Sequence, residues 1–245
     1  MRSDAESNYQ ALQLGLQRRL SRGLQTLVSY TWSHAIDSIS YDAVTDAPSR
    51  ASSDFDIRHN FKGSVTFDLP SPGWNSVAKA VLGGWGTDLI VSMQSATPLT
   101  LNAGQTTIGG ELVTIRPDVV AGVPWYVDDP AVAGGRRVNK LAFRAPAAGT
   151  QGTSGRNALR ALAVGQADLA VRRKFKLTES LALQFRAEAF NLFNQPNFGA
   201  YNTTYNNADV GVPSMTLNKV MGGGVNSLYQ IGGSRSLQFA LRLSF

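Results

Sequence analysis

Seven segments of this chain alternate apolar and polar residues with a period of two, and no other sequence feature limits the fold as strongly. Such alternation predicts β-strands with one apolar and one polar face. In the last segment, the two parities hold Leu237, Phe239, Leu241, Leu243 and Phe245 against Ser236, Gln238, Ala240, Arg242 and Ser244. The segments are residues 9–20, 24–33, 58–69, 84–96, 166–175, 181–193 and 235–245.

The lengths of these segments suit a bilayer. Eleven residues at about 3.3 Å each span roughly 36 Å, which a 45° tilt projects to about 25 Å, the height of the apolar band of a membrane barrel. The connections alternate between short (21–23, 70–83, 176–180) and long (34–57, 97–165, 194–234). We therefore predict an all-β fold, an antiparallel meander that forms the C-terminal portion of a transmembrane β-barrel, with short periplasmic turns and long extracellular loops.

The composition of the chain is that of a protein whose apolar residues are spread in alternation rather than gathered in long runs. Charged residues make up 16% of the chain, against about 25% in an ordinary soluble domain. No apolar run approaches the ~18 residues of a membrane-spanning helix. The absence of cysteine excludes disulfides, thiolate metal sites and a thiol nucleophile. The net charge of +6 comes from scattered basic residues rather than one patch, so we expect no nucleic-acid partner.

Six stretches carry a resemblance to a known family. They begin at Tyr9 (YQALQLGLQRR), Val28 (VSYTWSH), Asp56 (DIRHNFKGS), Arg116 (RPDVVAGVP), Gln184 (QFRAEAFNLFNQPNF) and Leu237 (LQFALRLSF). In this order the chain resembles the C-terminal part of the β-barrel of a TonB-dependent outer-membrane receptor of the Oar-like branch. The resemblance implies a bacterial outer-membrane location and uptake of a large, scarce, unknown extracellular solute.

The resemblance also implies partners and a missing part. Residues 1–245 would be a C-terminal fragment of a barrel of about 22 strands, with the plug and N-terminal domains absent. A TonB-type energy transducer would act through those upstream segments, and no secretory signal is visible at the start of the chain. The expected partners of the wall itself are outer-membrane lipid and the barrel-insertion machinery. The insertion signal implied for the C-terminus is Phe245, Leu243, Leu241 and Phe239.

Polar residues of the alternating segments are candidates for the barrel lumen. They are Gln184, Arg186, Glu188, Gln238 and Arg242. Their charges could contact a plug or an anionic solute, but we favour a ladder in which they satisfy neighbouring strands. Tyr30, Trp32 and Trp85 lie near strand ends, where a membrane barrel carries its aromatic girdles.

No motif supports catalysis, so we expect no enzyme activity, no cofactor and no metal. The spacing Ser76-x-x-Lys79 matches penicillin-interactive enzymes, but the partner motifs S-D-N and K-T-G are absent. We interpret it as a periplasmic turn. His34 and His59 with Asp54 and Asp56 could ligate a metal, but we expect solvated or lumen-rim side chains. The same two acids with Asp42 and Asp46 could ligate Ca²⁺, although they lack the EF-hand order.

Two other classes remain open. A small stand-alone porin-like or adhesin barrel needs closure and an even number of strands. A soluble β-sandwich binding module would bury the rows Leu12, Leu14, Leu16 and Leu237, Phe239 against each other. A barrel leaves both rows in lipid, so the exposure of these rows separates the two readings.

Overall fold

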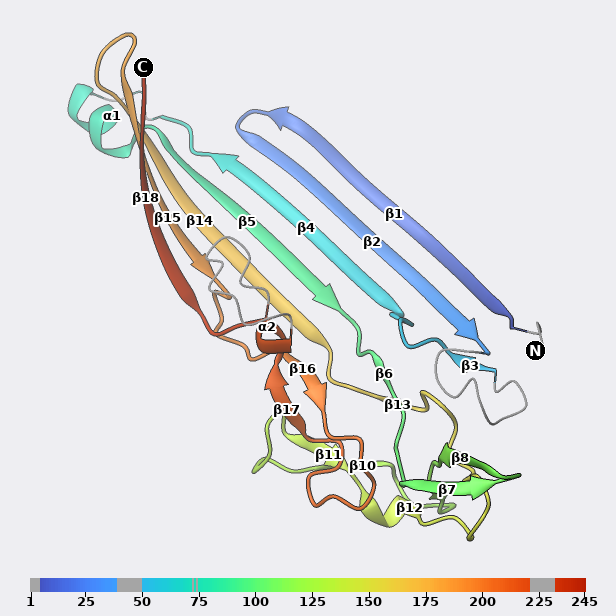
Figure 1. The fold of residues 1–245 in the computed structure, drawn as a ribbon. Coiled ribbons are helices and arrows are strands. Elements are labelled where there is room, and N and C mark those ends of the chain that lie inside the picture. Colours follow the sequence, from blue (N-terminus) through green and yellow to red (C-terminus); the bar gives the residue numbers. More distant parts are fainter. Residues whose placement is uncertain (1–4, 39–49, 72, 74, 221–231) are drawn as a thin grey trace.

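One large antiparallel sheet forms most of the molecule. The computed structural model describes residues 5–38, 50–71, 73, 75–220 and 232–245. Seven long strands follow one another across the sheet, with a two-residue strand β3 (Ala51–Ser52) beside β2 (Figure 1). The long strands in order are β1 (Ser7–Ser21), β2 (Leu24–Asp37), β4 (His59–Asp68), β5 (Trp85–Gln94), β14 (Val164–Lys176), β15 (Ala182–Phe190) and β18 (Ser236–Ser244). The predicted all-β meander is confirmed.

Strand ends differ from the sequence expectation in two places. β2 continues four residues beyond Ser33, because β1 pairs with it as far as Asp37 and β3 pairs with its last two residues on the other side. This corrects the prediction that residues 34–57 form a loop throughout. β15 stops at Phe190 rather than Phe193, because Asn191 adopts a left-handed backbone conformation (φ 50°) that cannot continue a strand.

The three short connections lie at one end of the sheet (Figure 1). Arg22 and Gly23 both have positive φ in the tight turn from β1 to β2. A Cβ at Gly23 would lie 2.4 Å from the carbonyl oxygen of Asp68, so only glycine fits there. The connector from β4 to β5 forms helix α1 (Ser76–Leu82), in which the Asn75 side chain caps the N-terminus by accepting from the Ala78 N–H.

The long connections at the other end contain short paired strands, some in hairpins and some between distant segments. We call residues 95–163, 191–220 and 232–235 the loop layer. The sequence analysis predicts irregular loops here, and the structure instead contains short paired strands. The pairs are β6 (Pro98–Leu99) with β13 (Leu159–Arg160), β7 (Gln105–Ile108) with β8 (Glu111–Thr114), β9 (Asp118–Val119) with β12 (Phe143–Arg144), β10 (Tyr126–Asp128) with β11 (Arg136–Val138), and β16 (Phe198–Tyr201) with β17 (Pro213–Thr216). A 3₁₀ turn η1 (Lys140–Ala142) and a short helix α2 (Leu217–Val220) complete it.

The buried apolar core lies in the loop layer and not against the sheet. Its members come from the small strands β11, β12 and β13, from η1 and from the segments between these elements: Leu101, Val138, Ala142, Phe143, Leu159 and Val210. The Trp125 ring packs on Phe143 at 5.7 Å between centroids. Every described residue of β1, in contrast, is exposed. Among the described residues, no helix is long and apolar enough to cross a membrane.

Candidate functional site

The strand registers sort the side chains of the sheet onto two chemically distinct faces. Residues paired across antiparallel strands point to the same side, so each register row belongs to one face. One row joins Leu16, Val28, Gly63, Val91 and Ala167. We call this side the apolar face. The adjacent row joins Gly15, Ser29, Lys62, Ser92 and Gln166, and its side is the polar face.

The apolar face is exposed on the outer strands β1 and β18, and most of its residues on the inner strands are half-buried among their neighbours. Leu14 and Leu16 are 55% and 64% exposed, and no second sheet packs on them among the described residues. The four C-terminal residues predicted as an insertion signal lie in the same surroundings, since Phe239, Leu241 and Leu243 pair with apolar-face residues of β15 and all four are exposed. The row Leu12, Leu14, Leu16 and the row of β18 therefore share one face and do not bury each other. A β-sandwich would require the opposite.

A chain of ion pairs crosses the polar face. Asp88 on β5 accepts hydrogen bonds from Thr66 (2.9 Å) and from Arg186 on β15 (3.0 Å). Arg186 also donates to Glu188 at 2.7 Å. Arg172, on the strand between them, lies 3.4 Å from Asp88 and donates to Asp68 at 2.6 Å. Four strands thus hold their charges in mutual contact on a single surface.

All five residues predicted to face the lumen lie on this polar face. The registers pair Gln184 with Arg242, Arg186 with Ala240 and Glu188 with Gln238. Arg186 forms one ion pair with Glu188 on its own strand and another with Asp88 of β5, two strands away, so the ladder between neighbouring strands stays a prediction. Whether the surface contacts a plug or a solute stays a prediction.

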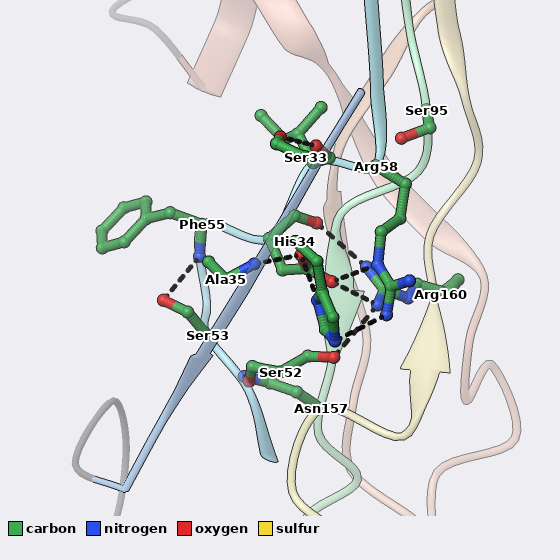
Figure 2. A network of polar contacts seen from close by, with 12 residues as sticks. Ser33, His34, Ala35, Ser52, Ser53, Phe55, Arg58, Ser95, Asn157 and Arg160 are labelled. Carbon is green, nitrogen blue, oxygen red and sulfur yellow. Dashed lines mark hydrogen bonds and ion pairs between the residues drawn. The ribbon is translucent and has the colours of Figure 1, made fainter. Parts of the chain in front are cut away.

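A second polar cluster, whose hydrogen bonds converge on Asp56, lies where β2 and β4 meet the loop layer. Figure 2 shows its His34, Arg58 and Arg160 side chains pointing toward one another. The Asp56 side chain is fully buried. It accepts hydrogen bonds from the Ala35 N–H (2.9 Å), Arg58 Nε (2.9 Å) and Arg160 Nη2 (2.6 Å), and His34 Nδ1 lies 3.0 Å away. Burial alone would raise the pKa of Asp56, but the donors at Ala35, Arg160, His34 and Arg58 outweigh burial and hold it well below its usual range. Asp56 is therefore ionised, and both of its carboxylate oxygens accept hydrogen bonds.

Two further residues of the loop layer reach the same region. The Arg156 side chain is fully buried and donates to both the carbonyl oxygen (2.6 Å) and the carboxylate (2.8 Å) of Asp37. The Asn157 side chain donates to the Ser52 carbonyl (2.8 Å) and to Asp54 (2.6 Å). With Arg160 they bind the layer to the ends of β2 and β3. These residues lie more than 100 positions from their partners, so the sequence alone gave no signal of the contacts.

The end of β15 is anchored by buried asparagines. The Asn191 side chain donates to the carbonyl oxygens of Gln195 and Gly233, and its own N–H donates to Asp168. The Asn197 amide makes reciprocal hydrogen bonds with the backbone of Gly165. Both asparagines belong to the stretch NLFNQPN, one of the stretches that resemble the receptor family. In the structure this stretch is the turn that holds the start of the connection from β15 to β18 against the sheet.

A cavity of about 170 Å³ lies on the polar face beneath α2. Its wall includes Asn60, Lys62, Ser92 and Gln94, and Asn197 and Leu217 lie on its other side. Amide, hydroxyl and ammonium groups thus meet water at the junction of the sheet and the loop layer.

The structure also bears on the candidate metal, Ca²⁺ and serine-enzyme sites. Among the described residues, no group of three or more His, Asp or Glu could hold a metal ion. The expectation of solvated side chains is wrong for Asp56, which Arg160 covers, whereas His59 is exposed and its Nδ1 lies 2.8 Å from the Tyr30 hydroxyl. Asp42 and Asp46 lie outside the described residues. Ser76 and Lys79 lie in α1 at the short-turn end, as the turn interpretation requires.

Comparison with known proteins identifies the family. No curated protein and no solved structure matches the chain. The model of the outer membrane beta barrel domain matches residues 1–238, nearly the whole chain. An exposed apolar face, a polar face crossed by ion pairs and a meander of long strands are the features that such a wall needs. The chain belongs to the outer membrane beta barrel domain family, and its place is the bacterial outer membrane.

Proposed function

We propose that this chain forms part of the wall of a TonB-dependent transporter that takes up a large, scarce solute. The single observation that carries the proposal is the open sheet, because its outermost strands β1 and β18 each pair on one side only among the described residues. An open edge is not stable in hydrocarbon, where every backbone group needs a partner. The sheet therefore needs further strands to close a barrel.

The strand directions favour a larger barrel over a stand-alone one. Each neighbouring pair in the seven-strand path is antiparallel, so β1 and β18 run in the same direction. Direct pairing of β1 with β18 would be parallel, whereas bacterial outer-membrane barrels have even numbers of antiparallel strands. An odd number of additional strands would restore antiparallel closure. This is compatible with the large barrels of the receptor family that the sequence resembles.

In this proposal, each face and each end of the sheet has a role. The apolar face meets lipid, and the ladder of Asp88, Arg186 and Glu188 lines the lumen. The loop layer lies outside the cell, where an intact receptor binds its solute, and a TonB-type partner would displace the plug from the lumen. The wall carries out no chemistry in this proposal, and the four C-terminal residues Phe239, Leu241, Leu243 and Phe245 serve recognition by the insertion machinery.

The experiment places an epitope tag in the gene, in its natural host, between Gly109 and Gly110. Both glycines have positive φ, and a Cβ at either would meet no atom within 4 Å, so this turn has room for an insertion. We expect the tagged protein in the outer-membrane fraction with heat-modifiable gel mobility, and in-cell crosslinks to the host's TonB-type protein.

The same experiment separates the alternatives. A heat-modifiable barrel that never crosslinks to the TonB-type protein, and that conducts ions in planar bilayers, would establish the porin class instead. A compact monomer stable in detergent-free buffer would contradict the membrane placement altogether.

A further inference from the structure

Arg173 occupies an unusual position on the apolar face. Its register row joins Trp85, Arg173, Phe185 and Leu241, so a cation lies among side chains that meet lipid. An arginine on the lipid face costs about 2–4 kcal/mol at the bilayer midplane and about 0–1 kcal/mol near the interface. Arg173 lies beside the short-turn end, since its partner Trp85 is the first residue of β5. It therefore belongs at the headgroup level.

The surroundings hold the guanidinium in place and leave its charge unpaired. The Arg173 Cζ lies 5.0 Å from the centroid of the Trp85 ring and 4.4 Å from that of Phe175, which is the geometry of a cation–π contact. One Nη2 hydrogen bond goes to the Ala80 carbonyl of α1. Within the described residues Arg173 has no acidic partner, and its Nε is buried without a hydrogen-bond acceptor. A fork of N–H donors with no anion is the usual counterpart of a phosphate.

Helix α1 extends the same surface. The Trp85 indole donates to the Val81 carbonyl at 3.1 Å, so the helix is tied to the strand next to Arg173. Val81 and Leu82 are 56% and 50% exposed, although both are apolar, and Lys79 in the last turn is exposed. Apolar side chains below basic ones are typical of an element that lies in the membrane interface.

We propose that Arg173, Lys79 and Trp85 form a binding site for the phosphate of an anionic phospholipid in the periplasmic leaflet. The proposal rests on the proposed function for one point, that the short turns lie on the periplasmic side. The charge of the phosphate complements Arg173 and Lys79, and its acyl chains lie against Val81 and Leu82. The bound lipid fixes the height of α1 and of the β4–β5 turn in the membrane.

The test uses the full-length protein extracted from outer membranes and examined by native mass spectrometry. Phosphatidylglycerol, phosphatidylcholine and lipid A are added separately as probes. We expect the wild type to retain phosphatidylglycerol about fivefold more than phosphatidylcholine, in line with the attraction of one basic side chain to an anionic surface. Arg173→Gln should remove this preference, and Arg173→Lys should keep part of it, because the charge stays while the planar fork is lost.

The matched control is Lys174→Gln. Lys174 is the exposed basic neighbour of Arg173 and pairs with Gln184 of the polar face, so its loss should leave the lipid preference unchanged. Heat-modifiable mobility of each variant shows that the barrel is intact. If Arg173→Gln does not insert, Lys79→Gln outside the sheet takes its place, with an expected twofold loss.

Three outcomes would overturn the site. They are an unchanged phosphatidylglycerol preference in inserted Arg173→Gln, an unchanged preference in Lys79→Gln where that variant is the one measured, and a preference of the wild type for lipid A, which would mean that this end faces the outer leaflet. Loss of the TonB-type crosslink with retained lipid preference would contradict the proposed function and leave the lipid site standing.

Discussion

The sheet and the loop layer use the same residue types in opposite ways. Leu101 and Leu159 of the loop layer are 2% and 1% exposed, whereas Leu16 on β1 is 64% exposed. Arginines differ likewise, since the Arg156 side chain is fully buried in the layer and that of Arg186 on the sheet is 36% exposed. The loop layer is stabilised by its own packing. The sheet depends on lipid at one face and water at the other.

This difference has a functional consequence. Loops that carry a ligand site are often loosely held, yet here the layer has its own core and is bound to the strand ends through Asp37, Asp56 and Asp54. If the loop layer binds a solute as proposed, that solute would meet a surface that is largely formed in advance, and a preformed surface loses less conformational entropy on binding. A substitution in one region should therefore leave the other region intact.

The largest effect is expected at Asp56. Asp56→Ala leaves Arg58 and Arg160 without their buried acceptor, and breaking a buried charge pair typically costs about 3–5 kcal/mol. We expect the loop layer of the membrane-inserted protein to become protease-sensitive while heat-modifiable mobility of the barrel persists. Asp128→Ala, at an exposed position of β10, is the control. Equal protection of both variants would show that the cluster does not hold the layer.

A smaller loss is expected from Leu101→Ala. Truncating a buried leucine costs about 2–5 kcal/mol through lost apolar contact and the cavity left behind. Limited proteolysis at increasing urea concentrations should show the loop layer opening at lower urea. Leu14→Ala on the apolar face should change this transition little, because Leu14 has no part in the core. Similar shifts for both would contradict the separation of the two regions.

The sheet has its own test in Phe239→Arg, because Phe239 lies two residues further from the short-turn end than Leu241, which shares the register row of Arg173. A charge on the lipid face near mid-membrane costs about 2–4 kcal/mol, whereas Ser244→Arg on the polar face should cost little. The measurement is the free energy of unfolding of the intact receptor in lipid bilayers. Comparable penalties at the two positions would disprove the assignment of the faces.

The smallest effect near neutral pH is expected from titration of Asp56. Its pKa is lowered in the folded protein, so its contribution to stability is fully present above its unfolded pKa of about 3.9 and is lost as pH falls toward the folded value. Protease protection of the loop layer should therefore be constant from about pH 7 to 5 and decline below about pH 4. The acid-induced decline should be weaker in Asp56→Asn. A decline that begins near pH 6 would contradict the assignment of this effect to Asp56.

The strands and their faces were predictable because their signal is local. Alternation along residues 237–245 is enough to assign Leu241 and Arg242 to opposite faces, and the register with β15 agrees. The ends of the strands were harder to predict from the sequence. Asn191 ends β15 through its backbone conformation, and β2 runs on to Asp37 because β1 and β3 both pair with its end.

The sequence by itself determined that this protein is a meander with one face for hydrocarbon and one for water, because a period of two repeats at every strand and needs no distant partner. Only the tertiary structure decided that the long connections form a layer with a core, that Asp56 is buried against Arg160, and that Arg156 is buried against Asp37. Those pairs join residues 104 and 119 positions apart. Nothing periodic marks them, since their geometry exists only once the sheet has brought the strand ends together.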